Sequence, residues 1–424
     1  MIKLLSLSIL LFLFPGFYGS PANDIFYDSE NENVKSIWFE KDTWRLAYPV
    51  ITMDKGEHIT LHFDVLGGEG GVLNYKIIHC DRDWHESDLF SSDYLTGFDE
   101  NPLHDYRASF NTTVKYVFYS LDLPNDDVDF KISGNYTILI YRPGEEDNPL
   151  LVRRFFVSEG TTGTSIIFRK PMTAGKDQTD QQSEITISTG SLAVNNPYTD
   201  ITLTILQNGR WDRAKYNMLP DFVGNGKLEY NTLSDKTLFP GGNEFRYFDI
   251  KTIRQKRQNI RDIVFLNGNY HAYLLPSEDR EFRQYFYNED FNGKFYIAME
   301  ESDDPDTEGD YVWVYFTLPS KYPVEGGSVY VEGSFTDWKT GPSNRMKYDP
   351  VKGCYEATFL LKQGWYNYEY AFVPDNGQNS GRYYFEGSHY ETSNDYVVLT
   401  YFRDPRQRYD RLTDAAVFNS LGKK

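Results

Sequence analysis

Cysteine is scarce in this chain, which has only Cys80 and Cys354 among its 424 residues. Exported domains that depend on disulfides carry many more cysteines, so the sequence excludes a disulfide-stapled scaffold. Free cysteines usually behave as small hydrophobic residues. We therefore expect two buried or half-buried free thiols, with a disulfide or a redox role as the alternative.

Basic residues are also few, since 43 Lys and Arg face 62 Asp and Glu, for a formal net charge of -19. Proteins that bind nucleic acid neutralise phosphates with clustered Lys and Arg. The charge balance therefore excludes a general nucleic-acid binder.

Long apolar runs are missing except near the N-terminus. There Lys3 precedes the apolar run Leu4–Phe14, and Pro15, Gly16 and small residues follow as far as Ala22. This order is typical of a secretory signal peptide, and the run is too short to span a bilayer. We predict a signal peptide over residues 1–22 and a soluble, exported protein that is not inserted in the membrane.

Helical periodicity is weak, and Arg411–Phe418 is the one stretch that fits a short helix. Aromatic residues make up 17% of the chain, a composition that favours pleated sheets. Apolar and polar residues alternate in His58–Val65 and again in Asp200–Ile205, as in strands with one buried face. The sequence predicts an all-β protein of tandem β-sandwich domains, immunoglobulin-like or early-set in type.

Two polar stretches indicate domain boundaries. Ser158–Thr164 is rich in small residues, and residues 300–310 hold seven carboxylates, which predicts an exposed hinge. The predicted layout is an N-terminal β-sandwich over 23–158, a middle β-domain over 159–300, an acidic linker over 301–310 and a C-terminal early-set-like β-sandwich over 311–424.

Motifs for catalysis or metal binding are incomplete. The sequence has no G-x-S-x-G elbow, and the His79, Cys80, Asp81, His85 and His104 group lacks metal-site spacing. A calcium-loop pattern that begins at Asn288 fails because Met299 stands where a glutamate is needed. We predict no enzyme activity, no catalytic residue, no cofactor and no metal; a glycosidase is a distant alternative, since 62 acids guarantee accidental carboxylate pairs.

Several short segments combine aromatic, charged and turn residues in an unusual way. They are His79–Leu89, Tyr94–Phe98, Tyr106–Thr112, Leu123–Asn125, Ser133–Tyr136, Arg153–Phe155, Gln207–Asp212 and Pro240–Asp249. In this order the segments resemble the plug proteins of the bacterial type IX secretion system, over residues 33–300. The resemblance implies a periplasmic protein that closes the periplasmic end of a large outer-membrane β-barrel translocon when no substrate is engaged, with that barrel as its partner.

Aromatic residues and arginines are the usual hot spots of protein interfaces, and the loop over 81–107 is rich in them. The candidate partner-binding residues are Trp84, Phe90, Tyr94, Phe98, Tyr106, Arg107, Trp211 and Arg246. The alternative is structural: the long loop would be a self-packed Ω-loop, and Asn208-Gly209 would form a hairpin turn that Trp211 anchors on the core.

The segments Val331–Trp338 and Gly364–Tyr370 resemble early-set immunoglobulin-like domains related to glycogen- and starch-binding modules. That resemblance makes Trp338 a candidate glycan-stacking residue and offers an alternative function, a cell-envelope carbohydrate-binding protein built of β-sandwich modules. No tryptophan follows Trp365, so a second stacking platform is missing. We favour a role for this domain in packing or docking.

Overall fold

The computed structural model describes residues 26–67, 70–230, 235–376 and 381–422, and the predicted signal peptide lies outside them. The described chain folds almost entirely into strands, which confirms the predicted all-β class. Its helices are single turns: α1 (Ser91–Tyr94), α2 (Pro197–Asp200), α3 (Pro305–Glu308) and the 3₁₀ turns at Asp235–Thr237 and Ser334–Thr336. Within these residues, no helix has the length and apolar content to span a membrane.

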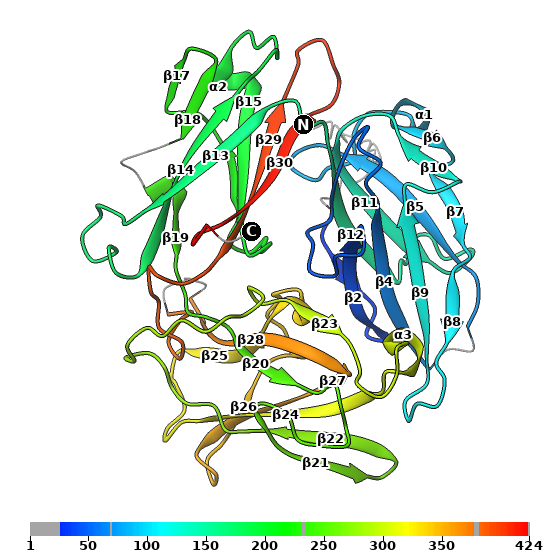
Figure 1. The fold of residues 1–424 in the computed structure, drawn as a ribbon, viewed down its shortest axis with the longest axis vertical. Coiled ribbons are helices and arrows are strands. Elements are labelled where there is room, and N and C mark those ends of the chain that lie inside the picture. Colours follow the sequence, from blue (N-terminus) through cyan, green and yellow to red (C-terminus); the bar gives the residue numbers. More distant parts are fainter. Residues whose placement is uncertain (1–25, 68–69, 231–234, 377–380, 423–424) are drawn as a thin grey trace, which may run out of the picture.

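The first unit is a pair of sheets on the right of Figure 1, with a small ribbon beside them. One sheet has the order β1 (Ser29–Glu30), β12 (Leu151–Ser158), β11 (Gly134–Tyr141), β5 (Leu73–Cys80), β7 (Glu100–Leu103), with β3 (Val50–Thr52) parallel to β12. The other sheet has the order β2 (Val34–Lys41), β4 (Ile59–Leu66), β9 (Tyr116–Leu123), β8 (Tyr106–Ala108), and the ribbon pairs β6 (Leu95–Gly97) with β10 (Val128–Phe130). Alternate apolar residues of these strands, such as Leu61 and Ile77, fill the core between the sheets.

The second unit, at the top left of Figure 1, also has two sheets. The first holds β13 (Gly163–Arg169), β14 (Asp180–Ser188), β18 (Lys227–Tyr230), β17 (Phe222–Gly224) and β19 (Leu238–Pro240). The second holds β16 (Lys215–Met218), β15 (Ile201–Gln207), β29 (Asp395–Phe402) and β30 (Arg411–Asn419).

The third unit lies at the bottom of Figure 1. One sheet holds β20 (Arg246–Asp249), β28 (Gly364–Pro374), β23 (Phe295–Ile297) and β25 (Gly327–Glu332). The other has the order β21 (Ile260–Leu266), β22 (Asn269–Leu274), β24 (Tyr311–Pro319), β27 (Cys354–Lys362), β26 (Lys347–Asp349).

The strand pairing does not follow the predicted boundaries at 300 and 311. The chain leaves the second unit after β19, builds the third unit, and returns for β29 and β30. β29 pairs with β15 from Ile201 opposite Phe402 to Gln207 opposite Tyr396. The stretch Arg411–Phe418, expected as a short helix, lies in strand β30, which pairs with β29. The local periodicity of a strand does not indicate which distant strand it pairs with, so the sequence did not predict this pairing.

The acidic stretch over 300–310 is not an exposed hinge, because it contacts the first unit. Thr113 donates from its backbone N–H and its hydroxyl to Asp310, at 3.1 and 2.7 Å. The Tyr116 hydroxyl donates to the Gly309 carbonyl at 2.8 Å, and Arg107 pairs with Asp304 at 3.0 Å. Two of the carboxylates that predicted solvation, Asp304 and Asp310, instead accept hydrogen bonds from the first unit.

Both cysteines are free and buried, which confirms the predicted pair of free thiols. Cys80 ends β5 and Cys354 begins β27, in different units. Burial raises the pKa of the Cys80 thiol to about 12, so this thiol stays protonated at neutral pH.

Candidate functional site

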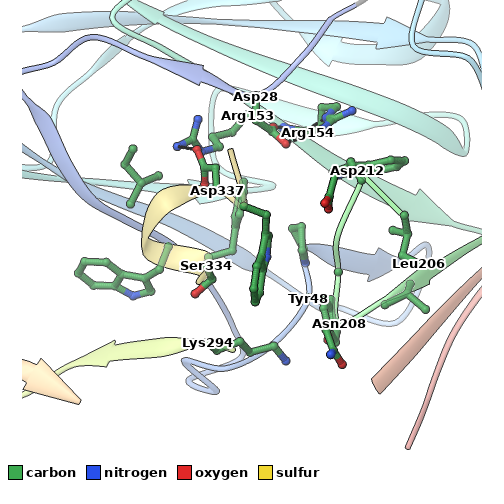
Figure 2. A pocket seen from close by; sticks show the side chains of 18 of the residues that line it. Asp28, Tyr48, Arg153, Arg154, Leu206, Asn208, Asp212, Lys294, Ser334 and Asp337 are labelled. Carbon is green, nitrogen blue, oxygen red and sulfur yellow. Dashed lines mark hydrogen bonds and ion pairs between the residues drawn. The ribbon is translucent and has the colours of Figure 1, made fainter. Parts of the chain in front are cut away.

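A cavity of about 580 Å³ lies where the three units meet (Figure 2). Its wall comes from all three: Tyr48, Arg153 and Arg154 from the first, Leu206, Asn208 and Trp211 from the second, Lys294, Ser334, Asp337 and Trp338 from the third. Three of the segments singled out in the sequence therefore converge on one place.

A tight turn carries the second unit's residues to the cavity. Asn208 and Gly209 have φ values of 53° and 69°, and the Arg210 N–H donates to the Gln207 carbonyl at 3.0 Å. This is a type I′ turn, as the Asn-Gly pair predicts. A Cβ at position 209 would lie 2.6 Å from the Tyr48 ring, so the close approach of the first unit also requires glycine.

Arg210 is fully buried and joins the second unit to the third. Its guanidinium lies 2.6 Å from Glu369, 3.0 Å from Glu332 and 2.8 Å from Asp212. It also lies over the Trp338 ring, 4.1 Å from the centroid. Burial alone would raise the pKa of Asp212, but Arg210 and its neighbouring arginines hold that pKa well below its usual range.

Arg153 and Arg154, on β12, extend the network from the first unit. Arg153 pairs with Asp337 of the third unit at 2.8 Å and with Glu30 at 3.2 Å. Burial opposes ionisation of Glu30, yet Arg153 and the hydrogen bonds around it lower its pKa to about 2.

Arg154 links the first unit to the second. It pairs with Asp28 at 2.8 Å, and its guanidinium lies over the Trp211 ring at 4.2 Å and the Trp84 ring at 5.0 Å. Buried ion pairs and cation–π contacts thus connect each unit to the other two around the cavity.

The chemistry of the wall favours binding or packing over catalysis. Each wall carboxylate that belongs to this network is already ion-paired with an arginine or a lysine. Burial lowers the pKa of Lys294, whose Nζ donates to the Leu46 carbonyl at 2.8 Å and lies 3.8 Å from the centroid of the Tyr48 ring. Across the part of the chain that the structure describes, no group of three or more His, Cys, Asp or Glu residues could hold a metal ion.

The candidate partner-binding residues separate into two sets. Trp84 and Tyr94 are buried. Trp211 is half-buried, and the centroid of its ring lies 5.3 Å from that of Trp84. Arg246 forms an ion pair with the buried Glu386 at 2.8 Å. Trp84 and Tyr94 lie in the interior, and Trp211 and Arg246 are half-buried, so a partner cannot contact most of the surface of these four residues. The other set faces solvent.

Phe90 and Phe98 are 76% and 77% exposed, near the α1 and β6 end of the first unit (Figure 1). Tyr106 is exposed at the edge strand β8, and Arg107 on the same strand is engaged by Asp304. The structure therefore does not bring the eight candidates together in one surface.

Trp338 is not a surface platform. It is 8% exposed, and Arg210 covers one face of its ring. A Cβ at Gly293 would lie 2.1 Å from the Trp338 ring, which shows how closely the loop of the third unit packs against it. The small exposed area of Trp338 faces the cavity, so a sugar has no open ring on which to stack.

The acidic half of this network was not among the candidate residues predicted from the sequence; it consists of Glu332, Glu369 and Asp337. Two of these carry a signal: Glu332 ends strand β25 directly after Val331, and Glu369 lies between two tyrosines in the aromatic-rich strand β28. A carboxylate inside an apolar strand is rarely buried unless it is paired, so such a position predicts a buried ion pair.

Comparison with known proteins shows which proteins this chain is similar to. Residues 34–159 match the family described as Type 9 secretion system plug protein 1st domain. No curated protein matches. A solved structure, the crystal structure of a hypothetical protein from Parabacteroides merdae ATCC 43184, is 32% identical with a TM-score of 0.88, and the match covers 93% of this chain and 100% of that one. The chain therefore belongs to the same family as the Parabacteroides merdae protein, and its residues 34–159 match the first domain of the type 9 secretion system plug proteins.

Proposed function

We propose that this protein closes the periplasmic end of the type IX secretion translocon, a large outer-membrane β-barrel, when no substrate is engaged. The observation that carries the proposal is the match of residues 34–159 to the plug protein first domain. The proposed place of action is the periplasmic side of the outer membrane, and the proposed role is steric rather than enzymatic.

The way in which the three units interlock supports this role. An object that blocks a wide aqueous pore must keep its shape under load. Apolar residues of the first unit, among them Trp38 and Phe118, share one core with the third unit. Residues of β12 likewise share a core with β15, β29 and β30 of the second unit. Continuous cores and buried ion pairs favour a rigid body over three loosely linked domains.

The first unit offers a contact surface for the barrel. Exposed aromatic residues are frequent hot spots in interfaces, and Phe90 and Phe98 remain available for this role. Carbohydrate binding loses its main support because Trp338 is covered.

Purification from native outer membranes tests the proposal. The full chain with a C-terminal affinity tag, extracted in mild detergent, should recover a very large outer-membrane barrel in stoichiometric amounts, chiefly in cells that lack secretion substrate. A strain without the protein should admit large antibiotics through the open pore. Recovery of the protein alone, with an outer membrane that stays tight in its absence, would refute the proposal.

A further inference from the structure

The third unit presents two phenylalanines that neither the core nor the cavity uses. Residues 275–294 connect β22 to β23 without a strand of their own. Within this segment Phe282 and Phe286 are 92% and 80% exposed, the most exposed aromatic side chains among the described residues. Four residues span at most about 14 Å of chain, so one partner surface can contact both rings.

The segment that carries these rings is firmly anchored. The Arg280 Nε donates to Glu386 at 2.8 Å, and the Arg280 N–H donates to the Phe385 carbonyl at 2.9 Å. Between the two rings, the Tyr285 hydroxyl donates to the Glu391 carbonyl at 3.1 Å. Beyond them, the Phe291 N–H donates to the Asn367 side chain at 2.6 Å. An anchored segment loses little conformational entropy when it binds, so contact of these rings with a partner has a small entropic cost.

Acidic residues flank the two rings along the chain, and the two arginines of the same stretch, Arg280 and Arg283, are both ion-paired. Glu278 is paired with Arg283 at 2.6 Å, but Asp279, Glu281 and Glu289 have no ion-pair partner among the described residues. Unpaired carboxylates beside an apolar group favour a partner with an apolar pocket and a basic rim.

We propose that Phe282 and Phe286 dock into an apolar pocket rimmed by Lys or Arg on the periplasmic face of the translocon barrel. This inference rests on the proposed function and adds a contact on the third unit to the one on the first. A second copy of the chain fits less well, since a symmetric contact would bring the same carboxylates together. Anionic lipid headgroups would repel them too.

The test compares tagged full-length variants in the same membrane purification. Phe282→Ser with Phe286→Ser should reduce recovery of the barrel at least about tenfold, because hot-spot residues carry most of the binding energy. The matched control is Tyr322→Ser with Val351→Ser, two residues of the third unit that are 69% and 94% exposed; it should leave recovery unchanged. Both variants should melt at the wild-type temperature because they alter exposed side chains.

A second variant tests the charge. Asp279→Asn with Glu281→Gln and Glu289→Gln should weaken recovery about threefold to tenfold and flatten its dependence on salt. If the wild type recovers the barrel and the phenylalanine variant does so equally, this inference is wrong while the proposed function stands. If the wild type recovers no barrel, both fall. Two other results would also overturn the inference. One is that the wild type floats with vesicles of phosphatidylethanolamine and phosphatidylglycerol and the phenylalanine variant does not. The other is that the wild type dimerises and the phenylalanine variant does not.

Discussion

Lys362 on β27 places its Nζ 2.8 Å from the Asp64 Oδ2 on β4, although 298 residues separate them along the chain. Both side chains are fully buried. The Tyr311 hydroxyl donates to the same carboxylate oxygen at 2.7 Å, and Lys362 lies 4.1 Å from the centroid of the Tyr116 ring. This pair joins the first unit to the third.

Removing one partner of this pair should be costly. Lys362→Met leaves the Asp64 carboxylate buried without its cation, so the free energy of unfolding in urea should fall by about 3–5 kcal/mol. Adding Asp64→Asn should recover much of that loss. Lys352→Met, which breaks an exposed pair with Glu356, should cost less than about 1 kcal/mol. A loss in the Lys362 variant as small as this control would contradict the ion-pair role.

Arg210→Met should destabilise the junction around the cavity. It leaves Glu332 and Glu369 buried with less compensation, and it uncovers the Trp338 ring. We expect a loss of about 3–5 kcal/mol, measured by chemical denaturation. The control Arg169→Met breaks an exposed pair with Glu184 on the second unit and should change stability little. Equal stability of the two variants would show that the network does not hold the units together.

Limited proteolysis should spare residues 300–310. A glutamate-specific protease would cut an exposed acidic linker first, but here the backbone of the segment is hydrogen-bonded to the first unit at Thr307 and Gly309. We expect early cuts elsewhere and no folded fragment of about 115 residues from a cut at this stretch. Rapid release of such a fragment would restore the hinge interpretation.

His79 should make stability depend on pH. Burial lowers the pKa of His79 to about 4, below its usual 6.5, so between these values the unfolded chain binds a proton that the native chain does not. Its contribution to the free energy of unfolding is complete above pH 6.5 and should fall by about 2 kcal/mol between pH 7 and pH 5. The difference between wild type and His79→Gln in urea melts should shrink by that amount at pH 5. A difference that is the same at both pH values would contradict the assignment.

Local patterns predicted the strands, because alternation such as that of β4 is typical of a strand with one buried face. The same alternation in β15 was predicted to leave one face exposed, but every residue of β15 is buried, because both of its faces are covered. They could not predict the partner of a strand. The return of β29 and β30 to the second unit depends on contacts with residues about 200 positions earlier. The acidic stretch over 300–310 misled for the same reason, since its hydrogen-bond donors lie near Thr113.

For the site, the sequence identified segments that meet at the cavity, but it did not show which of their residues are buried. Trp84, Trp211 and Arg246 stand out by composition, yet hot-spot residues and buried anchors share the same composition, so burial alone distinguishes them. Phe282 and Phe286 were overlooked because an exposed phenylalanine is indistinguishable in sequence from a core one. Exposure follows from how Arg280 and Tyr285 hold their segment on residues 385–391.

The most direct test of the central claim is the ionic conductance of the purified translocon in a planar bilayer. Adding this protein to the periplasmic side should close the wide pore in proportion to the protein added, and a buffer-only addition should not. Conductance that stays at its open value when the barrel is saturated with the protein would contradict the plug role.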